Sequence, residues 1–240
     1  MARILVGLAA LTGDLRKVQE HFDLVEVRAS LGEWPKDATL KRWRKSVPPA
    51  FVFTVVFPPD VASLASTPEA EESLRATLHV AAVLQARCVL LQTPPDVRPT
   101  AANKKKLAAL FQKIPAEGTV RCWEASGLWE PEDVMATARS VRALPVLDAA
   151  QDELPPGPLA YTRLRAMGKA AATSRTLDRL AAALRGRREA FIVVEDPKEA
   201  SAVRAALPAL VAKAARTLGT PAPMLVRPAS APLVAEDEEQ

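Results

Sequence analysis

The chain has 240 residues, of which 49% are hydrophobic and 25% are charged, values typical of a globular protein with one large core. No apolar stretch is long enough to predict a membrane span, so we expect no membrane partner. Cys88 and Cys122 lie inside apolar runs, which indicates buried thiols in a reducing cytoplasm and argues against a disulfide framework or a zinc site.

The net charge of +4 is distributed unevenly along the chain. Residues 219–240 are rich in Pro and Ala and hold four acidic residues against one basic residue, Arg227, which leaves an excess of seven basic residues elsewhere. We expect this acidic tail to be disordered and to follow one domain formed by residues 1–218. The basic excess favours an anionic small molecule or nucleic acid as partner; the oligomeric state stays open.

Short apolar runs alternate with helical patterns along the chain. The predicted strands are residues 4–8, 24–29, 52–57, 88–92, 119–124, 144–148, 160–165 and 191–195. The predicted helices are residues 15–21, 39–45, 69–85, 101–114, 131–141, 176–187 and 198–218. The link between residues 148 and 160 shows no helical pattern.

About eight repeats of a strand and a helix over this length favour an α/β fold of the TIM-type (β/α)8 barrel class, incomplete or irregular at the link without a helix. An open, doubly wound sheet is the alternative. The sequence contains no GxGxxG or GxxxxGK[ST] motif, so nothing favours the nucleotide-binding versions of that sheet.

Five segments, which together cover most of residues 22–210, resemble in order the motifs of the YecE-like family, also called domain of unknown function 72. They are FDLVEVRASLGEWPKDATLKRWRKSVPPAFVFTVVFPP, LLQTPP, VRCWEASGLW, AYTRLRAMG and IVVEDPKEASAVRAALPAL. The resemblance implies a TIM-type barrel and supplies no reaction. The sequence departs from the family pattern at several positions: Arg28 replaces Asn, residues 29–32 (ASLG) replace Ser-Thr-Phe-Tyr, Val56 replaces Lys, Arg165 replaces His, and Glu195 with Asp196 replaces paired Asn.

Polar residues in and after the predicted strands would meet at the C-terminal mouth of such a barrel. We expect Glu26, Glu124, Asp148 and Glu195 to be catalytic, and Arg28, Gln92, Tyr161, Arg163 and Arg165 to bind substrate. Apolar neighbours predict a raised pKa for Glu124, whereas Arg28 or Arg163 would keep Glu26 ionised. The sequence thus predicts an anion-binding pocket with hydrolase or lyase chemistry on a phosphorylated or carboxylated small molecule.

The sequence leaves four other interpretations open. A structural ion-pair network would use the same charged residues, and a non-catalytic scaffold would keep them after its site had decayed. We expect no cofactor and no resident metal, although Glu26, Glu124 and Asp148 are the ligand types that magnesium uses. Nucleic-acid binding would use basic helix faces at residues 41–45, 104–106 and 185–188.

Overall fold

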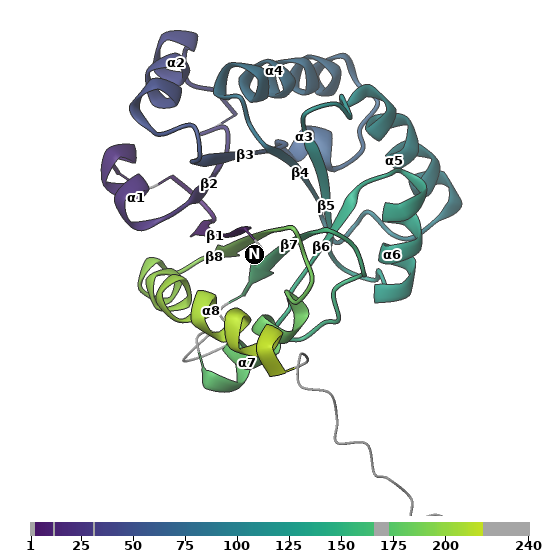
Figure 1. Ribbon diagram of the computed structural model, residues 1–240. Helices are drawn as coiled ribbons and strands as arrows, with labels where there is room; N and C mark the ends of the chain where they lie inside the picture. Colours follow the sequence, from purple (N-terminus) through teal and green to yellow (C-terminus); the bar gives the residue numbers. More distant parts are fainter. Residues whose placement is uncertain (1–2, 12, 31, 166–172, 218–240) are drawn as a thin grey trace, which may run out of the picture.

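Eight short apolar runs form parallel strands, and in this computed structural model each strand pairs with the next and β8 pairs with β1 (Figure 1). The structure describes residues 3–11, 13–30, 32–165 and 173–217. The strands are β1 Arg3–Leu8, β2 Leu24–Val27, β3 Val52–Val56, β4 Cys88–Thr93, β5 Val120–Ala125, β6 Leu144–Leu147, β7 Leu159–Leu164 and β8 Glu189–Val194. The predicted TIM-type barrel is confirmed, and it is closed; the expected disordered tail lies outside the described residues.

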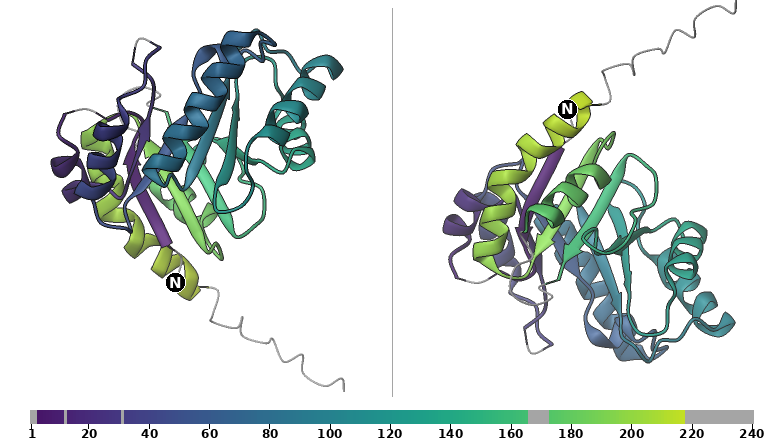
Figure 2. Two further views of the ribbon diagram at one scale, coloured as in Figure 1. Left: turned by 90° about the horizontal axis from the view of Figure 1, so that it is seen from above. Right: turned by 90° about the horizontal axis from the view of Figure 1, so that it is seen from below.

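Helices surround the barrel, as the end-on view in Figure 1 and the two side views in Figure 2 show. They are α1 Leu15–His21, α2 Asp37–Ser46, α3 Pro59–Ala62, α4 Pro68–Leu84, α5 Ala101–Lys113, α6 Pro131–Ser140, α7 Ser174–Ala183 and α8 Pro197–Thr217. Threonine hydroxyls cap the starts of α4, α5 and α7 by accepting a backbone N–H. The short α3 was not predicted, and α7 ends four residues earlier than predicted, shortly before Gly186 with its φ of 71°.

The predicted absence of a helix between β6 and β7 is confirmed, since residues 148–158 form turns (Figure 1). Arg187, which is only 8% exposed, forms hydrogen bonds with the backbone of this link. Its guanidinium donates to the backbone carbonyls of Gly157, Leu159 and Leu154. A buried arginine thus satisfies carbonyls that a helix would have satisfied internally.

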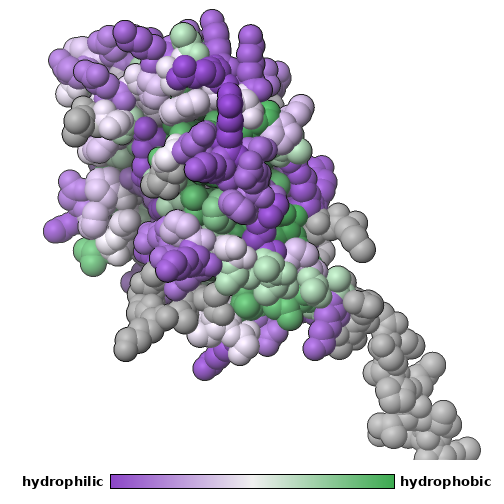
Figure 3. Space-filling view, turned by 90° about the vertical axis from the view of Figure 1, so that its left-hand side faces the viewer, coloured by the Kyte–Doolittle hydropathy of each residue, from purple (hydrophilic) through white to green (hydrophobic). Residues whose placement is uncertain are grey.

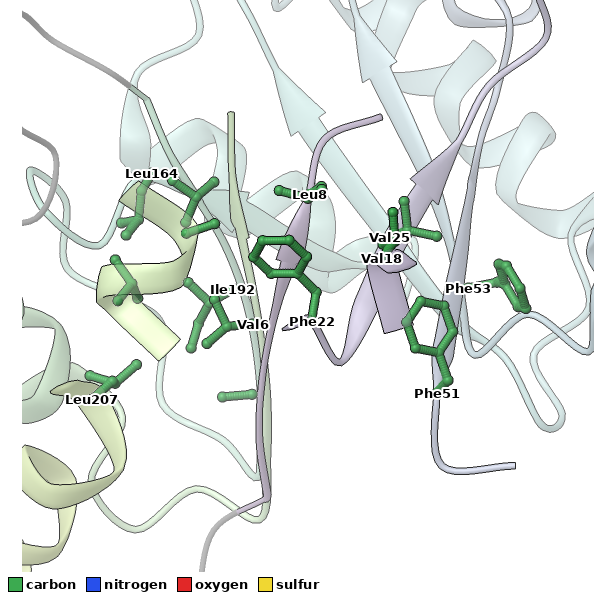
Figure 4. Close-up of a cluster of buried hydrophobic side chains, with 14 of the residues drawn as sticks. Val6, Leu8, Val18, Phe22, Val25, Phe51, Phe53, Leu164, Ile192 and Leu207 are labelled. Carbon is green, nitrogen blue, oxygen red and sulfur yellow. The ribbon is translucent and has the colours of Figure 1, made fainter. Parts of the chain in front are cut away.

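Alternate side chains of each strand pack in two directions. Inside the barrel lie aliphatic side chains such as Leu24, Leu90 and Val193, the rings of Tyr161 and Phe191, and the two free thiols. Burial raises the pKa of the Cys122 thiol well above its usual range, so this thiol is kept neutral. Outward-facing residues pack against the helices; Figure 4 shows one such cluster, which includes residues of β1, β8, α1 and α8.

One face of the molecule is largely polar. The face in Figure 3, seen from the left of Figure 1, is mostly hydrophilic with smaller hydrophobic areas. Within the described ranges, no helix is both long enough and apolar enough to cross a membrane.

Candidate active site at the barrel mouth

The period of two in the strands brings polar side chains to the C-terminal mouth of the barrel. Leu24, Leu90, Cys122 and Tyr161 belong to the cluster inside the barrel. The residues two positions later are Glu26, Gln92, Glu124 and Arg163, which therefore point to the same side of their strands, nearer the C-terminal end. Arg28 and Arg165 follow at the next step. Ion pairs and hydrogen bonds join these six side chains and Tyr161, and we call this set the mouth network.

Glu26 is the most deeply buried acid of the mouth network, with no exposed surface. Its Oε1 accepts from the hydroxyl of Tyr161 at 2.9 Å and lies 3.4 Å from Nε of Arg163. Its Oε2 accepts from Nη2 of Arg28 at 2.7 Å. Burial raises the pKa of Glu26 above its ordinary value; the charges of Arg163 and Arg28 and the Tyr161 and Arg28 hydrogen bonds oppose this shift without cancelling it.

Glu124 has more donors than Glu26. Its Oε2 accepts from Nη1 of Arg163 at 3.0 Å and from Nε2 of Gln92, and its Oε1 accepts from Nη2 of Arg165. Burial acts to raise the pKa of Glu124, but the charge of Arg163 and the hydrogen bonds from Arg165, Gln92 and Arg163 outweigh it, and the pKa is lowered. The predicted assignment was therefore wrong in direction: Glu26 has the raised pKa and Glu124 the lowered one.

Two residues connect the carboxylates. Gln92 accepts from Nη1 of Arg28 at 2.6 Å and donates to Glu124, and Arg163 contacts both acids. Arg163 is 11% exposed, whereas the side chains of Arg28 and Arg165 are 38% and 52% exposed. Arg28 and Arg165, which are accessible to solvent, thus cover the buried centre of the mouth network.

Asp148 and Glu195 are not part of the mouth network. Asp148 lies just after β6 and accepts from backbone N–H groups of Ala150 and Arg165, so it orders the link and the start of the Arg165 segment. Glu195 is exposed because β8 ends at Val194 and the chain turns into α8, where Asp196 accepts from the backbone N–H of Lys198.

The two acids and Asp148 do not form a carboxylate cluster of the kind that magnesium uses. Among the residues described, no group of three or more His, Cys, Asp or Glu side chains is placed to hold a metal ion. Asp148 instead accepts from the backbone N–H groups of Ala150, in the link after β6, and of Arg165, just after β7.

A pocket of about 350 Å³ adjoins the mouth network, and the sequence had not indicated it. Its lining residues are Arg28, Ala29, Gly32, Val56, Phe57, Pro58, Pro59, Ala62, Gln92 and Pro94. One signal was available: the same tripeptide, Pro-Pro-Asp, occurs at residues 58–60 after β3 and at 94–96 after β4. Proline fixes φ and removes a backbone donor, so these turns present apolar surface beside the mouth.

The basic residues considered for nucleic acid lie on separate parts of the molecule. Figure 1 places α2, α5 and the end of α7 at well-separated positions around the barrel. Several of these residues have structural partners: Arg44 donates to the carbonyl of Pro48, Arg187 to that of Leu159, and Lys104 pairs with Asp133 at 2.6 Å. The described residues therefore present no single basic stripe of the kind that follows a nucleic-acid backbone.

Comparison with known proteins identifies both the family and the fold. Residues 7–225 match the family described as "Protein of unknown function DUF72". No curated protein is similar enough in sequence to match the chain. A DUF72 family protein from Enterococcus faecalis V583 is 18% identical, with a TM-score of 0.61 over 92% of this chain and 99% of that chain.

Two further structures have a similar fold. A DUF72 family protein from Thermotoga maritima MSB8 is 14% identical, with a TM-score of 0.60 over 91% of this chain and all of that chain (100%). A protein described as L-ribulose 3-epimerase is 15% identical, with a TM-score of 0.64 over 97% of this chain and 100% of that chain. At these identities the likeness concerns the fold alone.

Proposed function

The chain belongs to the DUF72 family of proteins of unknown function, and we propose that it binds a small carboxylated or phosphorylated molecule at the barrel mouth and performs hydrolase or lyase chemistry on it. One observation carries the proposal: three guanidinium groups converge on two carboxylates. The centre keeps a positive charge even with both acids ionised, and a bound anion would balance it.

The exposed arginines suggest how a ligand would reach the acids. Arg28 covers Oε2 of Glu26 and Arg165 covers Oε1 of Glu124. An anion that engages both guanidinium groups would draw them from the carboxylates and uncover these oxygens. Glu26 would then lose a counter-charge and hold its proton more firmly, while Glu124 would keep Arg163 and Gln92. The opposite pKa displacements support Glu26 as the acid and Glu124 as the base.

Titration calorimetry with inorganic phosphate and with citrate tests the binding step. We expect wild type to bind at least one of them, and Arg165→Gln to bind it about tenfold more weakly, because one charge-assisted pair is lost. Arg75→Gln, an exposed position on α4, is the matched control and should bind like wild type. Absence of binding to wild type, or equal affinities for the two variants, would overturn the proposal.

The chemical step is tested separately, with a panel of phosphate monoesters and hydroxy acids followed for product formation. Glu124→Gln should lose turnover by about a hundredfold or more while retaining ligand binding, as expected for loss of a general base. If no member of the panel is turned over but the anion binds, the hydrolase or lyase part of the proposal fails and the binding part stands.

A non-catalytic scaffold is the second candidate, and one observation favours it: every carboxylate oxygen of Glu26 and Glu124 already has an internal partner. In that case the mouth network would serve stability alone. Arg165→Gln would then lower the melting temperature while no anion raises the melting temperature of either wild type or the variant. A ligand-dependent rise in wild type that is reduced in Arg165→Gln excludes the scaffold.

A further inference from the structure

We infer that the ligand of the mouth network has an apolar body: the site takes an aryl or alkyl carboxylate or phosphate monoester, with its anionic group on Arg28 and its body in the adjoining pocket. This inference rests on the proposed function and adds the class of molecule. It follows from the lining of the pocket, the free donors of Arg28 and the scarcity of other polar groups.

The pocket is apolar over most of its lining. Val56, Phe57 and Ala62 form buried parts of its wall, at 2%, 4% and 4% exposure. Three prolines and Ala29 complete the apolar surface, and Arg28 and Gln92 are the polar side chains among the lining residues. A volume of about 350 Å³ lies at the small end of the range for small-molecule sites, which suits one ring or a short chain.

Arg28 is placed to hold the anionic group at the edge of this pocket. Its Nε donates to the carbonyl of Ala9, its Nη1 to Gln92 and its Nη2 to Glu26. A guanidinium has five N–H donors, so within the described residues each terminal nitrogen retains one N–H beyond these bonds. A carboxylate or phosphate group can engage these N–H groups first, before Arg28 leaves Glu26.

The same lining disfavours a sugar body. Burying a hydroxyl without a hydrogen-bond partner weakens binding. Arg28 and Gln92 are already engaged with each other and with the two acids, so they leave little for several hydroxyls. An apolar body instead gains from burial against Val56 and Phe57.

Titration calorimetry with three probes tests the inference: inorganic phosphate, phenyl phosphate and ribose 5-phosphate. Wild type should bind phenyl phosphate about tenfold more tightly than inorganic phosphate, since burying a ring gains at least about 1.4 kcal/mol. Ribose 5-phosphate should bind no more tightly than inorganic phosphate. The readout is the ratio of the affinity for phenyl phosphate to the affinity for inorganic phosphate, which separates the contribution of the ligand's body to binding from that of its anionic group.

Two variants locate the effect. Ala29→Leu fills the pocket and Val56→Thr places a hydroxyl in its wall with little change of shape, and each should bring the phenyl-to-phosphate ratio close to one. Ala38→Leu, at an exposed position on α2, is the matched control and should keep the tenfold ratio. Melting temperatures establish which variants are folded. If Ala29→Leu is not folded, Val56→Thr alone provides the test.

The outcomes separate the two proposals. If wild type binds neither these three probes nor citrate, the proposed function itself fails; if it binds citrate and none of the three probes, only the apolar-body inference is overturned. If phosphate binds in an Arg165-dependent way but phenyl phosphate binds no more tightly, or if the ratio survives both pocket variants, the apolar-body inference alone is overturned. Tighter binding of ribose 5-phosphate than of phenyl phosphate would also overturn it.

Discussion

Glu26 and Glu124 both contact Arg163, yet their pKa values move in opposite directions. The difference lies in the number and quality of donors. Glu26 is fully buried, and its contact with Arg163 is a 3.4 Å ion pair in which Nε forms no hydrogen bond. Glu124 accepts direct hydrogen bonds from two arginines and Gln92. Desolvation is therefore the larger effect on the pKa of Glu26, and charge-assisted hydrogen bonding is the larger effect on the pKa of Glu124.

These opposite displacements predict opposite pH dependences of stability. Glu124, with a pKa below 4.5 in the folded chain, contributes stability above pH 4.5 that is lost as the pH falls through its folded pKa. Glu26, with a raised pKa, favours the folded state at low pH, and this contribution is lost as the pH rises through its folded pKa.

Melting temperatures measured from about pH 3 to about pH 8 check these pH dependences. This range includes the ordinary pKa of glutamate. Relative to wild type, Glu124→Gln should be destabilised at neutral pH and should converge with wild type in acid. Glu26→Gln should have the same melting temperature as wild type in acid, and its melting temperature should exceed that of wild type increasingly as the pH rises. Parallel curves for the two variants would contradict the assignment of acid and base.

At the scale of the elements, close approach of β1 and β2 depends on Gly7. These strands pair over Gly7 and Leu8 alone. A Cβ at Gly7 would lie 1.8 Å from the carbonyl oxygen of Leu24 and 2.7 Å from its Cγ. Leu24 and Glu26 lie two residues apart on β2, and their side chains point to the same side of the strand. The contact of Gly7 with Leu24 therefore also positions Glu26 in the mouth network.

We therefore predict that Gly7→Ala destabilises the protein by about 3 kcal/mol, because the backbone of β2 must move. Gly118→Ala is the control: its Cβ would meet no atom within 4 Å, but its φ of 73° is unfavourable for alanine, at a cost of about 1 kcal/mol. Urea unfolding measures both. A Gly7→Ala variant no less stable than Gly118→Ala would show that β2 adjusts freely.

For the whole molecule, a second set of ion pairs lies at the end of the barrel opposite the mouth network. Glu189 begins β8, and its carboxylate pairs with Arg3 of β1 at 2.8 Å and with Arg87, just before β4, at 3.1 Å. Arg3 also donates to the carbonyl of Ala50 before β3. A buried acid thus joins chain segments that are distant in sequence at the point where the barrel closes.

Replacement of Glu189 by Gln should lower the free energy of unfolding by about 2 kcal/mol, because it leaves two arginines without their buried counter-charge. Glu117→Gln, in the exposed loop before β5, should change it by less than about 0.5 kcal/mol. Chemical denaturation of both variants measures the difference. Anion binding at the mouth should be unchanged in Glu189→Gln if the two ends act independently.

The sequence alone predicted the alternation of strands and helices, because strand and helix periodicities are local and repetitive, and it favoured a barrel over an open sheet. Of the nine side chains that it predicted at the mouth, seven meet there. The closure of the barrel depends on the pairing of β1 with β8, which are far apart in the sequence, so it was decided by the tertiary structure. The sequence could not place Asp148 and Glu195, since the chain turns directly after β6 and β8. Only the tertiary structure decided which acid has the raised pKa, because burial and the number of converging donors depend on several strands at once. The apolar pocket, formed by turns after β3 and β4 beside Arg28, was also visible only once these segments were brought together.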